Sequence, residues 1–469
     1  MMKFSAVILF LVLSAVAAAS QSGRVVQASA DKGDGRAVKE LFDEANGYRK
    51  LKFEEFEKKK LAVSKALREQ TEREQKQLAA KLAAKAAERS ELSADDIYYL
   101  ALLHWIAENL DATSETLQKF LARAERTPER TQTARSLLVV TSAKQKKFDE
   151  AVAALAEYQK AEPVKPSERL RMNSELAKAY LADDQPAKAS PYAAEAFAIS
   201  RSLAVDAAMR TVGIDLVYDN ALVLFDARRR SGEIEQADIA LEEFRKIAGS
   251  LGNSVFYYYA ADKLITYRIE SGRKPLALET YLSMLVAASK ELPLEGQRSD
   301  ALLRLRKREK HYKLLGEPAP EFLTVDKWFP GTPTKISDLK GKVVLIDFWA
   351  TWCGPCFDAF PSLIEWHQDL REQGFEIIGF TRYYGRGEGR PVNETEEIAF
   401  LERFKLKYKL PYDFVVGKDQ STQMLYGATA LPTAVLIDRK GVVRYIEAGT
   451  SSSRLVEMRE MILKLLAEK

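Results

Sequence analysis

The two cysteines of the chain, Cys353 and Cys356, stand three residues apart in the stretch VVLIDFWATWCGPC. Residues at this spacing lie on the same side of a helix, so the two sulfur atoms can reach each other. Pro355 is tolerated in a first helical turn, and a helix N-terminus stabilises a thiolate. The pattern predicts a redox-active dithiol in which Cys353 attacks a substrate disulfide and Cys356 resolves the mixed disulfide.

A third candidate, Asp347, lies inside the apolar run Val343–Trp349 just before the cysteines. Such a continuously apolar run predicts a strand that is buried on both faces. Burial of a carboxyl group without a partner is costly and raises its pKa. The residue is therefore either hydrogen-bonded for structural reasons or kept as a proton carrier. Its place shortly before Cys353 favours a carrier that takes the proton from Cys356.

Two other uses of the cysteine pair are disfavoured. A zinc site needs two more ligands, and none of the histidines, His104, His311 and His367, stands at ligand spacing from the thiols. A purely structural bridge between residues three apart would fasten almost nothing. We therefore expect no metal and no cofactor beyond the redox-active disulfide itself.

Composition and charge set the wider frame. The chain has 469 residues, which suggests two or three domains, and 46% of them are hydrophobic. Its formal charge of +4 is small for this length and gives no support for a nucleic-acid partner. The tightest basic cluster, RLRKREKHYK at Arg304–Lys313, is predicted to be the solvated end of a helix.

The N-terminus has the pattern of a secretory signal. Lys3 precedes the apolar run Phe4–Ala19, which is short for a membrane span and is followed by small and polar residues. We predict a signal peptide over residues 1–30, with cleavage favoured over an uncleaved anchor. An exported, periplasmic or extracytoplasmic protein meets an oxidising environment, where a local cysteine pair in a large chain favours redox work.

Residues 31–315 are predicted to be helical throughout. Residues 31–92 are rich in Lys, Glu, Ala and Leu and predict a long, solvated, charged helical segment. Residues 93–315 contain a series of similar helical hairpins, whose turns recur about every 37 to 48 residues. This resembles a tetratricopeptide-like array with a concave surface for a protein partner. An irregular all-helical domain remains the alternative.

The sequence pattern changes over residues 316–469. Pro318 and Pro320 end the helical region, and strands and helices then alternate. This order predicts a mixed sheet covered by helices, with a closing hairpin across DRKG. The predicted strands are Val343–Trp349, Phe375–Thr381, Ala434–Asp438 and Val442–Glu447, and the predicted helices are Pro355–Glu372, Glu394–Lys407 and Ser453–Ala467.

The stretch DFWATWCGPC resembles the active site of the thioredoxin superfamily. The segment 316–469 resembles its exported TlpA/ResA-type disulfide reductases, through GEPAPEF and YGATALPTAVLIDRKG as well. The resemblance implies a C-terminal α/β thioredoxin-like fold behind the all-α N-terminal region. It also implies that Cys353 is the nucleophile, Cys356 the resolving thiol and Asp347 the buried acid.

The resemblance further implies how substrates bind. Pro432 matches the proline that this family holds cis against the disulfide, and Leu431 would offer its backbone to the substrate. Trp349 and Trp352 match the aromatic flank. Disulfide-containing proteins would be the substrates, and a membrane or exported thiol would supply electrons.

Two features depart from the family pattern. Many members carry a Glu three residues beyond the second cysteine, where this chain has Ala359 beside Asp358. Proton handling then falls to Asp347. The segment TRYYGRGEGRPVNETEE is either an exposed loop or a substrate-selecting insertion that uses Tyr383, Tyr384 and Arg386.

Two other functions compete with a protein-disulfide reductase. A peroxiredoxin-like peroxidase shares the PAPEF opening, but it requires Thr or Ser and Pro where this chain has Ala350 and Ile346. An interaction scaffold would use the helical region to bind a partner and keep the redox domain as an accessory. Replacement of Cys353 by Ser would then leave partner binding intact.

Overall fold

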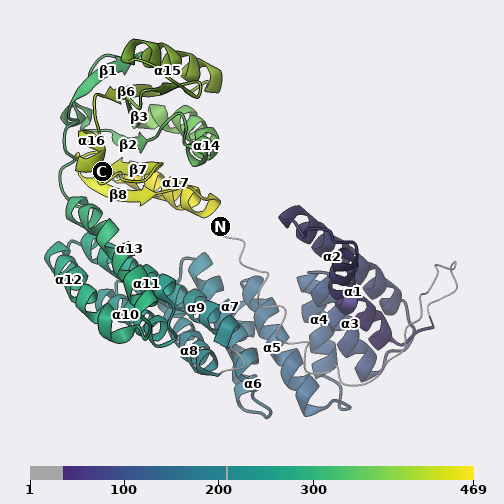
Figure 1. Cartoon of the computed structure of the whole chain (residues 1–469). Coiled ribbons are helices and arrows are strands. Elements are labelled where there is room, and N and C mark those ends of the chain that lie inside the picture. Colours follow the sequence, from purple (N-terminus) through teal and green to yellow (C-terminus); the bar gives the residue numbers. More distant parts are fainter. Residues whose placement is uncertain (1–34, 207–209, 469) are drawn as a thin grey trace. The chain divides into compact units, whose positions relative to one another are not determined.

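The computed structural model describes residues 35–206 and 210–468 (Figure 1). The predicted signal peptide over residues 1–30 lies outside the described residues. The chain divides into two compact units, one that ends at Ala240 and one that begins at Leu241. Among the described helices, none is long and apolar enough to cross a membrane.

The all-helical N-terminal region is confirmed. Up to Leu314, the described residues form helices joined by short turns (Figure 1). In chain order the helices are α1 (Val38–Lys58), α2 (Lys65–Ala87), α3 (Ala94–Ile106), α4 (Leu110–Leu121), α5 (Pro128–Lys144), α6 (Phe148–Gln159), α7 (Pro166–Ala182), α8 (Pro186–Val205), α9 (Arg210–Arg230), α10 (Ile234–Ser250), α11 (Ser254–Glu270), α12 (Lys274–Glu291) and α13 (Glu295–Leu314).

The segment over residues 31–92 is helical where it is described, as predicted, but it is neither one continuous helix nor fully solvated. The segment folds as two helices, α1 and α2, that pack on each other and on α3. The break falls where Lys60 takes a left-handed conformation and the Ser64 hydroxyl caps α2 by accepting the amide of Leu67. Both helices bury an apolar stripe, with Leu41 and Leu82 at its centre, because their small and apolar residues recur at helical spacing.

The predicted helical hairpins are confirmed at each of the five turns. In each turn three residues separate two helices, and the central residue has a positive φ. A residue in this left-handed conformation ends a helix, because the chain changes direction there. The central residues are Glu108, Lys146, Asp184, Gly232 and Gly272. The same turn is thus used repeatedly, although only two of the five use glycine.

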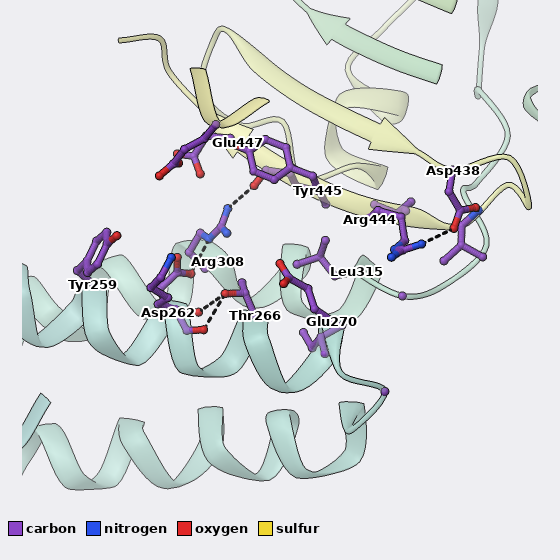
Figure 2. Close-up of a pocket in the computed structure, with 18 residues that line it drawn as sticks. Tyr259, Asp262, Thr266, Glu270, Arg308, Leu315, Asp438, Arg444, Tyr445 and Glu447 are labelled. Atoms are coloured by element: carbon purple, nitrogen blue, oxygen red, sulfur yellow. Dashed lines mark hydrogen bonds and ion pairs between the residues drawn. The ribbon is translucent and has the colours of Figure 1, made fainter. Parts of the chain in front are cut away.

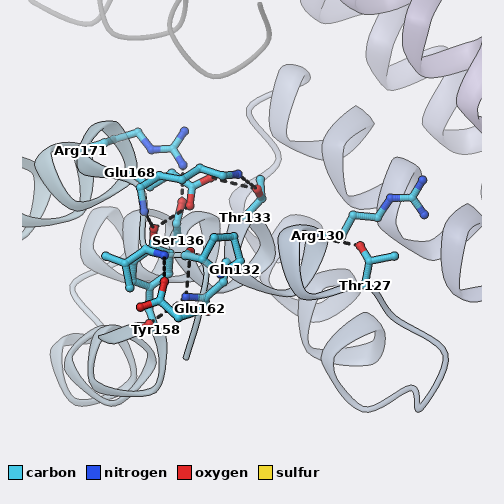
Figure 3. Close-up of polar contacts among 12 residues, drawn as sticks. Thr127, Arg130, Gln132, Thr133, Ser136, Tyr158, Glu162, Glu168 and Arg171 are labelled. Carbon is cyan, nitrogen blue, oxygen red and sulfur yellow. Dashed lines mark hydrogen bonds and ion pairs between the residues drawn. The ribbon is translucent and has the colours of Figure 1, made fainter. Parts of the chain in front are cut away.

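A buried polar network ties α5, α6 and α7 together (Figure 3). The Glu168 carboxylate is 1% exposed and accepts hydrogen bonds from the Thr133 hydroxyl at 2.9 Å and the Tyr158 hydroxyl at 2.8 Å. The buried Arg171 guanidinium donates to Ser136 nearby. Burial lowers the pKa of Arg171, and the charge of Glu168 opposes that effect. The acid therefore satisfies two hydroxyl donors and offsets a buried cation.

Beyond α13 the chain forms the predicted thioredoxin-like fold. One six-stranded sheet has the order β1-β6-β3-β2-β7-β8, and β4 and β5 form a separate hairpin. The strand β2 pairs with β3 in parallel and with β7 in antiparallel fashion. The strands are β1 (Val325–Phe329), β2 (Val343–Phe348), β3 (Phe375–Arg382), β4 (Arg386–Gly387), β5 (Arg390–Pro391), β6 (Asp413–Gly417), β7 (Thr433–Ile437) and β8 (Val443–Ala448).

Three long helices follow the predicted segments closely, namely α14 (Gly354–Leu370), α15 (Glu394–Tyr408) and α17 (Ser452–Ala467). Their side chains share one core with one face of the sheet. The strands β1, β4, β5 and β6 and the short helix α16 (Ser421–Leu425) were not predicted. Each has five residues or fewer, too few for a periodic pattern to stand out.

We predict that Glu168→Ala destabilises the helical unit by about 3 kcal/mol, because two buried hydroxyls lose their acceptor and the buried Arg171 guanidinium loses the nearby charge that offsets it. Urea unfolding of the full chain, followed by far-ultraviolet circular dichroism, measures the change. Glu157→Ala, which removes an exposed ion pair with Lys160, is the matched control and should leave the midpoint unchanged. Equal midpoints for the two variants would contradict the role given to Glu168.

Candidate active site

The strand β2 lies in the centre of the sheet, between β3 and β7, and ends five residues before Cys353. All six of its residues are buried, as the apolar run predicted. Asp347 lies opposite Gly379 on β3 and Ala434 on β7. These small neighbours leave space on the sheet face for larger side chains. A Cβ atom at Gly379 would lie 3.0 Å from the indole nitrogen of Trp349 and 3.2 Å from the Tyr412 ring.

Cys353 and Cys356 form a disulfide at the start of α14. The S–S distance is 1.98 Å, and the sulfur-bearing residues are 4% and 1% exposed. Cys353 is the residue that precedes the helix, and Pro355 occupies its first turn. The free amides and the dipole of a helix N-terminus favour negative charge here. When the pair is reduced, this position stabilises a thiolate on Cys353.

Asp347 is 4% exposed and lies on the sheet face that carries the disulfide. Side chains alternate along a strand, so Asp347 shares its face with Leu345 and Trp349, which belong to the same core as both cysteines. Burial raises the pKa of Asp347 to about 7. One of its carboxylate oxygens has no hydrogen-bond partner among the described residues. A carboxyl group in this state can accept and release a proton near neutral pH.

Two further buried polar residues, Tyr412 and His367, lie in the same domain as Asp347 and were not predicted to take part in the site. The Tyr412 hydroxyl and His367 Nδ1 lack a hydrogen-bond partner among the described residues, as does the indole N–H of Trp349. Burial, and then the charge of Asp347, raise the pKa of Tyr412 well above its usual value. The His367 ring lies 6.3 Å from that of Tyr412. Neither residue belongs to a recognisable motif, so nothing in the sequence pointed to them.

The two tryptophans of the motif occupy opposite environments. Trp349 is 1% exposed and packs against Phe404 and Phe414, with ring centroids 5.3 and 4.8 Å away. It cannot touch a substrate in this position, because core side chains cover it. Trp352 is 57% exposed beside the cysteines. Of the expected aromatic flank, only Trp352 reaches the surface.

The Leu431–Pro432 peptide bond is cis, as the resemblance implied. Pro432 is buried at the start of β7, whose first residue, Thr433, pairs with Phe348 at the end of β2. Leu431 is partly buried and packs against the core that contains the disulfide. The end of β2 and the start of β7 thus bring Leu431 and Pro432 to the same edge of the sheet as the cysteines. In contrast, Asp358 is exposed and Ala359 is buried, so neither of these two positions brings a second carboxylate to the thiols.

The segment after β3 reaches Trp352. The Tyr384 ring meets the Trp352 ring edge-to-face at 5.3 Å. The Arg382 guanidinium lies 4.2 Å from the centre of the Tyr384 ring, and Gln423 of α16 donates to the Tyr384 hydroxyl at 3.1 Å. The buried Glu397 carboxylate accepts the backbone amide of Tyr384 at 2.9 Å. Tyr384 is therefore held rigidly against the exposed tryptophan.

The other two residues expected in this segment have different surroundings. Tyr383 donates its hydroxyl to Asp326 at 2.6 Å, and Arg386 is exposed on the β4–β5 hairpin. The ring that packs against the exposed tryptophan is that of Tyr384.

Known proteins resemble the C-terminal part of the chain. Residues 314–462 match the Redoxin family model. The Thiol-disulfide oxidoreductase ResA of Geobacillus kaustophilus is 31% identical over 149 residues, which cover 32% of this chain and 78% of that protein. The ResA of Bacillus subtilis is 30% identical over 141 residues, which cover 30% of this chain and 71% of that protein.

Among solved structures, a putative thiol:disulfide interchange protein DsbE from Chlorobium tepidum is 30% identical. The match covers 33% of this chain and 98% of that protein, with a TM-score of 0.27.

The fold and the site define a thiol-disulfide oxidoreductase with a thioredoxin-like domain. Both cysteines lie where the strand gives way to the helix, and the two ResA relatives are named thiol-disulfide oxidoreductases. Through its C-terminal third, the chain belongs to the ResA family of thiol-disulfide oxidoreductases.

We predict that Asp347→Asn changes the pH dependence of stability of the disulfide form. The carboxyl pKa is about 7 in the folded protein and about 3.9 in the unfolded chain. Between these values the folded state holds a proton that the unfolded state has lost, so the free energy of unfolding falls as pH rises. The fall approaches about 4 kcal/mol by pH 8.

The variant cannot titrate at this position and loses that fall. It should therefore be more stable than the wild type at pH 8, with the difference shrinking toward pH 5. Urea unfolding at pH 5 to 8, followed by tryptophan fluorescence, tests this. Asp358→Asn, an exposed carboxyl on α14, should keep the wild-type profile. Parallel profiles for Asp347→Asn and the wild type would contradict the raised pKa.

Proposed function

We propose that this protein is an exported reductase of disulfides in polypeptide substrates. The observation that carries the proposal is the Cys353–Cys356 disulfide at a helix N-terminus, on the same sheet face as a buried carboxyl group whose pKa is about 7. These are the groups that thiol–disulfide exchange needs, namely a stabilised thiolate, a second thiol in reach and a proton acceptor.

The proposed cycle begins from the reduced pair. The Cys353 thiolate attacks one sulfur of the substrate disulfide, a mixed disulfide forms, and the other substrate sulfur leaves as a thiolate. Asp347 takes the proton of Cys356, whose thiolate then attacks the Cys353 sulfur. The second substrate thiol leaves, and the enzyme disulfide forms. Two electrons pass to the substrate, and the structure corresponds to the oxidised end of the cycle.

The direction of electron flow rests on the residues between the cysteines. Gly354 and Pro355 are the dipeptide that thioredoxin carries there, and thioredoxin reduces its substrates. Export rests on the basic and apolar residues at the start of the sequence. An exported reductase needs a membrane or exported thiol donor to renew the pair. The helical hairpins offer surface for a protein partner, whose binding would place the redox domain near its substrates.

Substrate binding is assigned to the exposed face beside the disulfide. Trp352 and Leu431 offer apolar surface, and Pro432 lies at the start of β7 next to the end of β2. Tyr384 extends this face, because its ring packs edge-to-face against that of the exposed Trp352. An extended polypeptide with a disulfide fits such an open surface better than a small molecule does. Trp349 supports the face from within the core.

We predict that Cys356→Ser traps a mixed disulfide between Cys353 and a polypeptide substrate, because the resolving thiol is gone. Non-reducing electrophoresis after incubation of the reduced variant with insulin should show the adduct. Cys353→Ser should form no adduct and should not reduce insulin. An adduct of equal yield in Cys353→Ser would contradict the assignment of the nucleophile.

We predict that Tyr384→Ala lowers kcat/KM for insulin reduction about 3- to 10-fold, because Trp352 loses an edge-to-face contact worth about 0.5–1.5 kcal/mol. Tyr384→Phe keeps the ring and loses the polar contacts of the hydroxyl, among them the hydrogen bond from Gln423, so it should stay within about 2-fold of the wild type. Equal losses in the two variants would show that the hydroxyl, and not the ring, is what matters.

A further inference from the structure

One face of the last turns of α13 is buried against the sheet, although most of the helix end is solvated as the sequence predicted. His311 is 3% exposed, and the Arg308 side chain is 11% exposed. Both stand in the basic cluster Arg304–Lys313, where most of the charged residues remain at the surface. Composition alone could not reveal this, because the partners of the two buried residues lie far away in sequence.

Arg308 links three elements (Figure 2). Its Nε donates to the Asp262 carboxylate of α11 at 2.9 Å, and Tyr312 donates to the same oxygen at 2.7 Å. One terminal nitrogen of Arg308 donates to the Ile446 carbonyl of β8 at 3.0 Å. The buried cation is thus neutralised by one helix and fixed to the sheet by a backbone oxygen.

The same nitrogen of Arg308 lies 2.9 Å from His311 Nδ1. A guanidinium can only donate, so Nδ1 must accept, and the ring proton must reside on Nε2. That nitrogen lies 2.9 Å from the Gly427 carbonyl and donates to it. Burial, and then the neighbouring Arg308, lower the pKa of His311 to about 4, so the ring is neutral. Arg308 therefore orients the histidine, and the histidine holds Gly427.

The backbone at Gly427 approaches the histidine very closely. Gly427 has a φ of +69°, and a Cβ atom there would lie 2.7 Å from the His311 ring. Only glycine combines this conformation with this contact. The residues that follow lead directly to Leu431 and Pro432, the proposed substrate-binding residues. His311 therefore fixes the start of the segment Gly427–Pro432.

Backbone pairing makes the same connection rigid. After α13, Gly316 donates its amide to Val443 at 2.8 Å, and Val443 donates back to Glu317 at 2.9 Å. Ala319 donates to Gly441 at 2.9 Å, so the connecting segment runs along the edge of β8. Lys274 of α12 bonds to the Leu315 carbonyl and pairs with Glu317. The end of the helical region is thus built into the sheet that carries the site.

We propose that His311 is a positioning residue for substrate binding: it holds the Gly427–Pro432 segment in place from α13. The proposal rests on the proposed function, because it assigns Leu431 and Pro432 to the substrate. It gives α13 a part in substrate binding that acts through the segment Gly427–Pro432. No chemical step is assigned to His311.

The test compares His311→Leu with His311→Gln in the full chain. Leucine fills the space without donating a hydrogen bond, whereas glutamine can restore the bond to Gly427. We expect His311→Leu to raise KM for insulin about 5- to 10-fold with kcat within about 2-fold, since a buried carbonyl loses its donor. His311→Gln should recover to within about 2-fold of the wild type. His104→Ala, a histidine in α3, is the matched control.

Two further readouts separate the possible outcomes. Hydrogen exchange at residues 427–434 should be faster in His311→Leu than in the wild type, and this holds whether or not insulin is a substrate. An unchanged KM together with unchanged exchange would overturn the proposal. Loss of activity toward oxidised glutathione as well as insulin would also overturn it, because the effect would then lie on the thiol pair. A wild type that reduces neither disulfide would instead refute the proposed function.

Discussion

The site depends on one constraint, which is the placement of a carboxyl group in the apolar centre of the sheet. Asp347 occupies a strand whose other residues are all apolar, between the small neighbours Gly379 and Ala434. Its burial opposes ionisation and raises its pKa to about 7. A protein built only for stability would replace this group with an apolar one. Its position one residue before the end of the strand that leads to the thiols is the basis of the proposed proton transfer.

Other elements of the C-terminal unit complete the site. The helix α14 presents the cysteines at its N-terminus, where thiolate charge is favoured. The cis Leu431–Pro432 bond directly precedes β7, and the segment that leads to it is fixed by His311 of α13. The helices α11 to α13 and the sheet are therefore one structural unit. The helical region and the redox domain differ clearly in sequence composition, yet hydrogen bonds from α13 join the helical region to the segment beside the site.

Features that depend on neighbouring residues could be predicted from the sequence. They are the cysteine pair at the start of a helix, the burial of Asp347, the five hairpin turns and the main strands of the sheet. Other features depend on residues that meet only in the folded chain. Arg308 and Asp262 are 46 positions apart, and His311 and Gly427 are 116 apart. The break between α1 and α2 was missed because one left-handed lysine and one serine cap carry no compositional signal. Trp349 and Trp352 stand three residues apart, and only the strand-to-helix geometry decides that one is buried and the other exposed.

The central claim is that the Cys353–Cys356 pair works as a reductant. Its most direct test is the reduction potential of the pair in the full chain, measured by equilibration with reduced and oxidised glutathione. A helix N-terminus and a buried proton acceptor of the thioredoxin kind predict a potential near about −270 mV. A potential near about −120 mV would contradict the account, because the pair would then be an oxidant that introduces disulfides into its substrates.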